Sequence, residues 1–105
     1  MNQSTNDRLG FLGLLYVAHK AVIGEELYSS LAKVRLLLVA KDATSNQALS
    51  TKRRATLAHV PLLEEFTEQE LGNALGHDSV TFVGIIDEKA AGAYLKKTKE
   101  GKKSE

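Results

Sequence analysis

The stretch "VRLLLVAKD", residues 34–42, decides how the rest of the chain is interpreted. Between Arg35 and Lys41 every residue is apolar. A continuous apolar run, rather than an alternation of apolar and polar residues, is typical of a strand that is covered on both faces. We therefore expect a buried central strand with helices on both sides of its sheet.

Working outward from this strand, three more segments have the composition of strands: "AVI" (21–23), "HVPLLEEF" (59–66) and "VTFVGIID" (80–87). Pro61 cannot donate to a ladder, so its strand should lie at an edge or begin there. Helical patterns at about 7–20, 24–33, 44–57, 67–76 and 88–97 separate the strands. The alternation predicts an α/β fold, a three-layer α/β/α sandwich with a central mixed four-stranded sheet.

The segment "TEQELGNALG", residues 67–76, carries strong helix signals and one contrary signal. Thr67 and Glu70 have the spacing of a capping box, and Gly76 stands where a helix ends in the left-handed conformation. Gly72 lies inside this helix, where it costs about 1 kcal/mol relative to alanine. Either another part of the chain approaches the backbone there, or the glycine is merely tolerated.

The other helices have weaker end signals. Asn6 or Asp7 could cap the first helix, which is apolar on most sides and is predicted to be largely buried. Thr44 and Gln47 have capping-box spacing, and Asp87 can cap the last helix.

Length and composition indicate one domain over residues 1–97 and a flexible charged tail over residues 98–105. The chain has no cysteine, which excludes disulfides and thiolate chemistry. No apolar run approaches the roughly 20 residues that span a bilayer, and the N-terminus lacks the basic start of a secretory signal. We expect a soluble, cytoplasmic monomer without a membrane partner.

The net charge of +1 is unevenly distributed along the chain. Residues 41–60 carry +3, residues 61–92 carry −6 and residues 93–105 carry +3. A basic patch and tail beside an acidic half fit a small surface for a polyanion, although solvated charge explains the same pattern.

Signals for catalysis are weak. His77 and Asp78 could form an acid/base pair, but a surface turn accounts for them better, because a general base needs a positioned partner and a pocket. The histidines lack metal-ligand spacing, and no phosphate-binding glycine loop or nucleophile elbow is present. We therefore predict no enzyme activity, metal, cofactor or small-molecule substrate.

Lys52 and Arg53 begin a basic run with Arg54 on the third helix. The run is either a solvated helix face or a set of phosphate contacts, to which Lys20 and Lys41 would add cations. Three Phe, three Tyr and no Trp are too few aromatic residues for a single-strand stacking platform. The remaining nucleic-acid partner is structured RNA, gripped through its backbone and shape.

The ordered segments "LGLLYVAHKAVIGEEL", "LLLVAKDATSNQ", "HVPLL" and "ELGNALG", followed by a valine-containing strand that ends in Asp, resemble a known family. This family is the ribosomal L-seven-Ae and L-thirty-e kink-turn-binding group, in its bacterial YlxQ-type branch. The resemblance covers residues 9–97 and implies a three-layer sandwich that binds structured RNA, typically a kink-turn, often ribosomal RNA on the ribosome.

The resemblance also implies an RNA-facing surface made of three segments. They are the start of the second helix, the turn after "AKD" and the loop after the "ELG" helix. In this chain they comprise Gly24, Glu25 and Glu26; Lys41, Asp42 and Ala43; and Gly76, His77, Asp78, Ser79 and Val80. The "ELG" glycine is Gly72, which would allow close packing either near the RNA or within the fold alone.

The chain departs from the Gly-x-Asn-Glu-x-x-Lys segment of the kink-turn readers. Only Gly24 matches, because Glu26 replaces the Asn, Leu27 the Glu and Ser30 the Lys. A shorter connection before "LLLVAKD" leaves a second register open, in which Lys33 would face the RNA. The first interpretation is a non-catalytic RNA-binding protein. The alternative is a protein-interaction module on the same fold that has lost RNA recognition.

Overall fold

The computed structural model describes the backbone of residues 3–103 and the side chains of residues 7–97. Its helices and strands follow the predicted alternation. Their order is α1 (Gln3–Val17), β1 (Ala21–Val22), α2 (Gly24–Ser29), the short 3-10 helix η1 (Leu31–Lys33), β2 (Leu36–Val39), α3 (Asn46–Leu57), β3 (Leu62–Leu63), α4 (Glu68–Leu75), β4 (Phe82–Ile85) and α5 (Glu88–Lys103).

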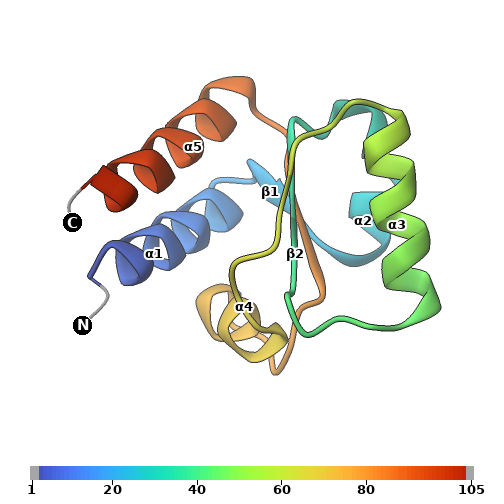
Figure 1. Ribbon diagram of the computed structural model, residues 1–105, viewed down its shortest axis with the longest axis horizontal. Coiled ribbons are helices and arrows are strands. Elements are labelled where there is room, and N and C mark those ends of the chain that lie inside the picture. Colours follow the sequence, from blue (N-terminus) through green and yellow to red (C-terminus); the bar gives the residue numbers. More distant parts are fainter. Residues whose placement is uncertain (1–2, 104–105) are drawn as a thin grey trace.

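The four strands form one mixed sheet in the order β1-β4-β2-β3. β4 runs antiparallel to both of its neighbours, and β2 runs parallel to β3. Helices α1, α4 and α5 lie on one side of the sheet and α2 and α3 on the other (Figure 1). The predicted three-layer sandwich with a mixed four-stranded sheet is confirmed.

The core is centred on β2, which is the continuous apolar run before Lys41. Every residue from Leu36 to Ala40 is at most 2% exposed, as expected for a strand covered on both faces. β3 is an edge strand that begins directly after Pro61, whose carbonyl accepts the Leu37 amide at 2.9 Å. Pro61 thus contributes an acceptor where it cannot contribute a donor.

Two of the predicted side-chain caps at helix starts are confirmed. Thr67 Oγ1 accepts the Glu70 amide at 3.1 Å, and the Glu70 carboxylate accepts the Thr67 amide at 2.9 Å, which completes the capping box of α4. The carboxylate of Asp87 accepts the Ala90 amide at the start of α5.

Thr67→Ala should lower the free energy of unfolding by about 1 kcal/mol, since the Glu70 amide loses its partner while the rest of the core is unchanged. Urea denaturation of both proteins measures this difference. Thr56→Ala removes only a hydroxyl that bonds back to the Lys52 carbonyl on the exposed side of α3. This control should stay within about 0.5 kcal/mol of wild type, and a Thr67 effect no larger would contradict the capping role.

Other boundaries differ from the predictions. α1 begins at Gln3, before the proposed caps Asn6 and Asp7. Ser45 rather than Thr44 caps α3, and Ser45 Oγ accepts the Ala48 amide at 3.1 Å. Ser45 is the residue directly before the first helical turn, and it has the extended backbone conformation of a cap residue. The capping box predicted for Thr44 and Gln47 is therefore not the cap of α3.

The first helix is also less buried than its apolar character indicates. Leu14 is 69% exposed and Val17 is 75% exposed, because α1 packs on α4 and α5 with only one side.

The ends of two other helices also differ from the predictions. α2 ends at Ser29 and is followed by η1, whereas the sequence predicts one continuous helix to Lys33. α5 continues to Lys103, beyond the predicted end at Lys97. The side chains of residues 98–105 lie outside the described residues, so the flexible tail and the single domain stay predictions.

Candidate nucleic-acid interface

The loop between α4 and β4, residues 76–81, is held tightly against α4. Gly76 ends the helix with φ 81°, and the His77 amide bonds to the Gly72 carbonyl at 2.8 Å. A Cβ atom at Gly72 would lie 2.7 Å from Ser79 Cα and 2.8 Å from the His77 carbonyl oxygen. The loop backbone is what approaches the helix at Gly72. The glycine therefore serves packing within the fold, and this packing shapes a segment that the family resemblance assigns to the RNA surface.

The far end of the same loop is fixed by Glu68 at the start of α4. Its carbonyl accepts the Val80 amide at 3.0 Å, and its carboxylate accepts the Thr81 hydroxyl at 3.2 Å. The loop is thus bound to α4 at both ends, and its shape follows from the helix.

The start of α2 faces this loop. Gly24 opens the helix with φ 63°, a backbone conformation that favours glycine, and nothing lies within 4 Å of the place where its Cβ would be. Gly24, Leu27 and Tyr28 share one side of the helix because of their spacing.

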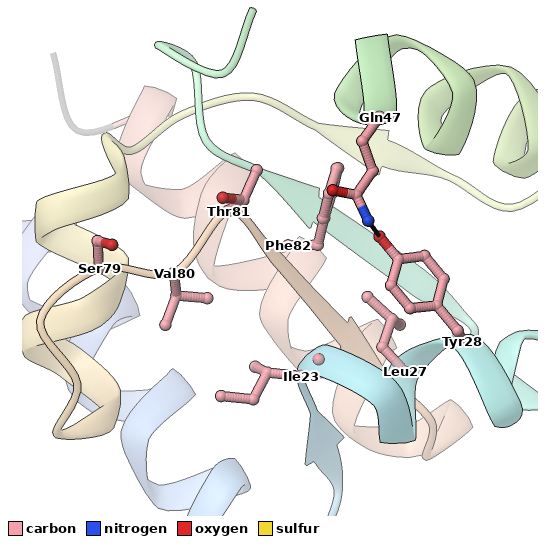
Figure 2. A pocket seen from close by; sticks show the side chains of 9 residues that line it. Ile23, Leu27, Tyr28, Gln47, Ser79, Val80, Thr81 and Phe82 are labelled. Atoms are coloured by element: carbon pink, nitrogen blue, oxygen red, sulfur yellow. Dashed lines mark hydrogen bonds between the residues drawn. The ribbon is translucent and has the colours of Figure 1, made fainter. Parts of the chain in front are cut away.

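A cavity of about 270 Å³ lies between α2, the start of α3 and the α4–β4 loop. Figure 2 shows the side chains from these three elements around it. The lining residues are Ile23, Gly24, Leu27, Tyr28, Gln47, Ser79, Val80, Thr81 and Phe82.

The cavity has apolar and polar walls but no ionised one. Its apolar residues include Leu27, Val80 and Phe82, which belong to the core. Gln47 Nε2 donates to Tyr28 Oη at 3.0 Å, and this hydrogen bond joins α3 to α2 across the opening (Figure 2). No Asp, Glu, His or Lys is among the lining residues, so the cavity offers donors and acceptors for binding but no general base near neutral pH.

The structure brings only part of the predicted surface to this cavity. Gly24, Ser79 and Val80 line it, although they are distant in sequence. Gly76, His77 and Asp78 lie in the same loop outside the cavity lining. Glu25 and Glu26 are exposed on α2 and do not line this cavity either.

The turn after β2 contributes hydrogen bonds that stabilise the fold. The carboxylate of Asp42 accepts the Glu68 amide at 2.9 Å, so it serves the beginning of α4. The Lys41 amide bonds to the Phe66 carbonyl, its side chain is exposed, and Ala43 is 8% exposed. Their part in binding RNA remains a prediction.

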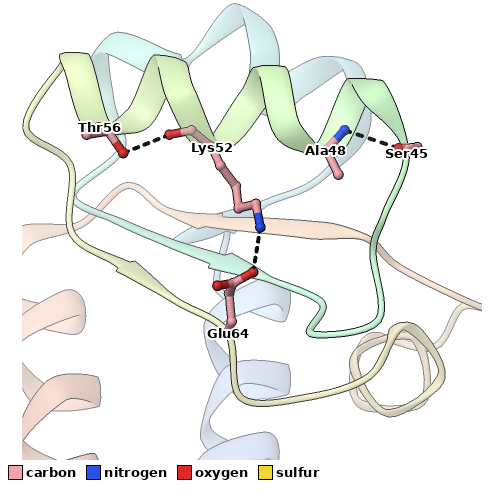
Figure 3. A network of polar contacts seen from close by, with 5 residues as sticks. All are labelled: Ser45, Ala48, Lys52, Thr56 and Glu64. Atoms are coloured by element: carbon pink, nitrogen blue, oxygen red, sulfur yellow. Dashed lines mark hydrogen bonds and ion pairs between the residues drawn. The ribbon is translucent and has the colours of Figure 1, made fainter.

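The predicted phosphate-binding cations differ in whether a carboxylate already pairs with them. Lys52 Nζ lies 2.8 Å from Glu64 Oε2, so this cation is already paired across α3 and the β3 segment (Figure 3). Arg53 and Lys20 are exposed on α3 and in the α1–β1 turn. Neither lines the cavity.

The geometry does not assemble the acid/base pair. His77 is exposed, and its Nε2 atom lies 3.1 Å from Tyr16 Oη on α1. Its described polar contact is therefore with Tyr16 and not with Asp78. Within residues 7–97, no group of three His, Cys, Asp or Glu side chains could hold a metal ion. Among the described helices, none combines the length and apolarity that a membrane crossing requires.

Sequence reasoning missed six of the lining residues: Ile23, Leu27, Tyr28, Gln47, Thr81 and Phe82. Tyr28 could have been found, because it follows Gly24 by four residues and must share its side of α2. Leu27 and Phe82 carry the pattern of core residues, and that pattern does not reveal that they also form a cavity wall.

Together these features define a small α/β/α fold with a cavity between a helix start and a fixed loop, and no residue that lines this cavity is charged. No family model matches the chain. A curated relative, the RNA-binding protein YlxQ of Enterococcus faecium, is 32% identical over 104 residues, which cover 95% of this chain and 96% of the relative. The chain therefore belongs to the YlxQ-type branch of the L-seven-Ae family, as the resemblance implied.

A solved structure of a protein of unknown function from Bacillus halodurans has the same fold. It superposes with a TM-score of 0.76 and covers 86% of this chain and 94% of its own, at 22% sequence identity. This likeness supports the architecture alone.

Proposed function

We propose that this protein is a non-catalytic, cytoplasmic RNA-binding protein that recognises structured RNA through the cavity between α2 and the α4–β4 loop. The observation that carries the proposal is the convergence of Gly24, Ser79 and Val80 on one cavity. The family resemblance assigns these residues to the RNA surface from two separate parts of the chain. The relative named as an RNA-binding protein covers nearly the whole chain and supports the same class of ligand.

The walls of the cavity suit a nucleotide. Apolar side chains accept the face of an unstacked base, while Tyr28, Gln47, Ser79 and Thr81 offer donors and acceptors to its edges. The exposed cations Lys20, Lys41 and Arg53 would contact phosphates outside the cavity. We propose a kink-turn or related loop, with ribosomal RNA and the ribosome as the setting.

A titration of the nuclease-treated protein with two labelled RNAs tests this proposal. One RNA is a standard kink-turn, and the other lacks its sheared G·A pairs. We expect tighter binding to the intact kink-turn. We also expect affinity to fall roughly tenfold or more between about 50 and 200 mM salt, because phosphate contacts release counterions. Equal but salt-sensitive binding to both RNAs would retain RNA binding and overturn the kink-turn proposal.

A pair of variants locates the surface. Ser79→Glu places a carboxylate at the cavity and should weaken RNA binding roughly tenfold by repelling phosphates. Ala93→Glu makes the same charge change on the exposed side of α5, on the other side of the sheet, and should bind like wild type. Equal affinities for the two variants would place the RNA elsewhere, and absence of binding to either RNA at low salt would overturn the proposed function.

A further inference from the structure

A second cavity, of about 240 Å³, lies at the end of α3, whereas the first cavity lies at its start. The walls of the second cavity come from η1, from the residues that lead into β2, from the end of α3 and from the turn before β3. Arg35 and His59 line it, and both are exposed. The lining of the second cavity therefore includes a permanent positive charge, which the lining of the first cavity lacks.

One side of α3 connects the two cavities. Gln47 lines the first cavity and Ala58 lines the second, and their spacing of eleven residues places them on the same side of the helix, about 16 Å apart along its axis. Thr51 and Arg54 lie between them on that side, at the spacing of successive helical turns. Thr51 contacts the Tyr28 hydroxyl of α2 at 3.5 Å, so this side of α3 faces α2.

The elements around the second cavity are basic and contain no carboxylate. Residues 27–41 and 43–63 include η1, β2, α3 and the turn before β3, and neither range has an Asp or a Glu. None of the cations beside the cavity joins an ion pair described within residues 7–97. These exposed cations are Lys33, Arg35 and Arg54. Together they would attract an anion to this surface.

The end of α3 is arranged in a way that tolerates an anion. Carbonyl groups at a helix end carry partial negative charge, but here three of them already accept the amides of Ala58, His59 and Val60. His59 has φ 61°, a left-handed conformation that glycine adopts at lower cost. The imidazole is thus present at a cost to the backbone, and its ring N–H can donate to a phosphate oxygen.

We propose that this side of α3 binds the phosphate backbone of the RNA stem that flanks the loop bound at the first cavity. Arg35 and Arg54 pair with phosphate oxygens and His59 donates to one, without reading the base sequence. The length of α3 between the cavities spans several successive phosphates of one strand. The inference rests on the proposed RNA binding and adds a contact with the stem, through residues that the family resemblance does not assign to the RNA surface.

The test compares the standard kink-turn on short stems with the same RNA after either stem is extended by about one helical turn. The nuclease-treated full chain is titrated at about 150 mM salt, where charges more than about 8 Å away are largely screened. We expect extension of one stem to raise the affinity about tenfold. The double variant Arg35→Gln with Arg54→Gln should lose this gain and bind the short RNA like wild type. With the extended RNA, the slope of log affinity against log salt should fall by about two, one for each phosphate contact removed.

A matched double variant controls for the loss of charge. Lys89→Gln with Lys96→Gln removes two exposed cations from α5, on the other side of the sheet (Figure 1), and should keep the gain from the longer stem. An equal loss in the two double variants would mean nonspecific attraction and would overturn the inference.

His59→Gly separates binding from folding. Glycine suits the left-handed conformation, so the midpoint of urea denaturation should rise, while the affinity for the extended RNA should fall about threefold. A purely structural role would move both quantities in the same direction. Unchanged affinity would overturn the role of His59 in the contact.

The two RNA proposals fail in different ways. If the intact kink-turn is preferred over the RNA without G·A pairs but neither longer stem raises the affinity, the stem contact is overturned and the first-cavity proposal stands. If the two loops bind equally but the gain from a longer stem depends on Arg35 and Arg54, the phosphate surface is supported and kink-turn recognition is overturned. Absence of binding to every RNA overturns both.

Discussion

Gly72→Ala is expected to lower the free energy of unfolding by about 2 kcal/mol, although alanine is the better helix former. The new Cβ would lie 2.7–2.8 Å from Ser79 Cα, the Ser79 nitrogen and the His77 carbonyl oxygen, which are all backbone atoms. They cannot give way by a side-chain rotation, so overpacking at the upper end of its usual range, about 3 kcal/mol, is the reasonable expectation. The gain in helix propensity returns about 1 kcal/mol.

Gly92→Ala is the matched control. Gly92 also lies inside a helix, but nothing is within 4 Å of the place where its Cβ would be. Only the propensity term remains, so this variant should be more stable than wild type by up to about 1 kcal/mol. Chemical denaturation of the three proteins measures both signs. Stabilisation by both alanines would show that the loop does not rest on Gly72.

Gly72→Ala should also affect the proposed RNA surface. Because the loop is bound to α4 at both ends, displacement at Gly72 should move Ser79 and Val80, which line the first cavity. We expect weaker RNA binding by Gly72→Ala at temperatures where the protein remains folded, with amide shifts concentrated in residues 76–81. Gly92→Ala should retain wild-type affinity.

The sequence predicted the fold well because its signals are local. The unbroken apolar run before Lys41 is typical of a buried strand, and Thr67 with Glu70 marked the start of α4 by their spacing alone. Even the edge position of β3 follows from the missing amide of Pro61.

The candidate site was less predictable because its geometry depends on distant segments. The helix pattern left open whether another segment approaches Gly72 or the glycine is merely tolerated, and only the packed loop decides between the two. Gln47 has helix-start spacing in the sequence, whereas in the structure it bonds to Tyr28 of another helix. In the sequence Glu26 stands where the family's kink-turn readers have Asn. In the structure its side chain lies outside the cavity that Gly24 lines, and only the packing of α2 determines this direction.

A charged contact between α1 and the segment before α4 should be the most sensitive polar feature of the fold. Arg8 is 8% exposed, and its Nη2 atom lies 3.4 Å from Glu65 Oε2. Its guanidinium also lies 5.7 Å from the centre of the Phe66 ring. Tyr94 of α5 stands beside the pair. Burial, reinforced by the negative charge of Glu65, raises the pKa of the Tyr94 hydroxyl, so this group stays neutral and adds no negative charge beside Glu65.

Arg8→Met should therefore lower the free energy of unfolding by about 3 kcal/mol. Methionine keeps an apolar stem in place of that of arginine, but the Glu65 carboxylate, whose side chain is only 23% exposed, loses its cation. Thermal and urea denaturation measure the loss. The double variant Arg8→Met with Glu65→Leu removes both charges and should recover part of the loss, since no charge is then left unpaired, although the buried Tyr94 hydroxyl no longer has either group beside it. If the double variant is as unstable as Arg8→Met alone, the loss comes from the packing of Arg8 on Phe66 and not from the unpaired carboxylate.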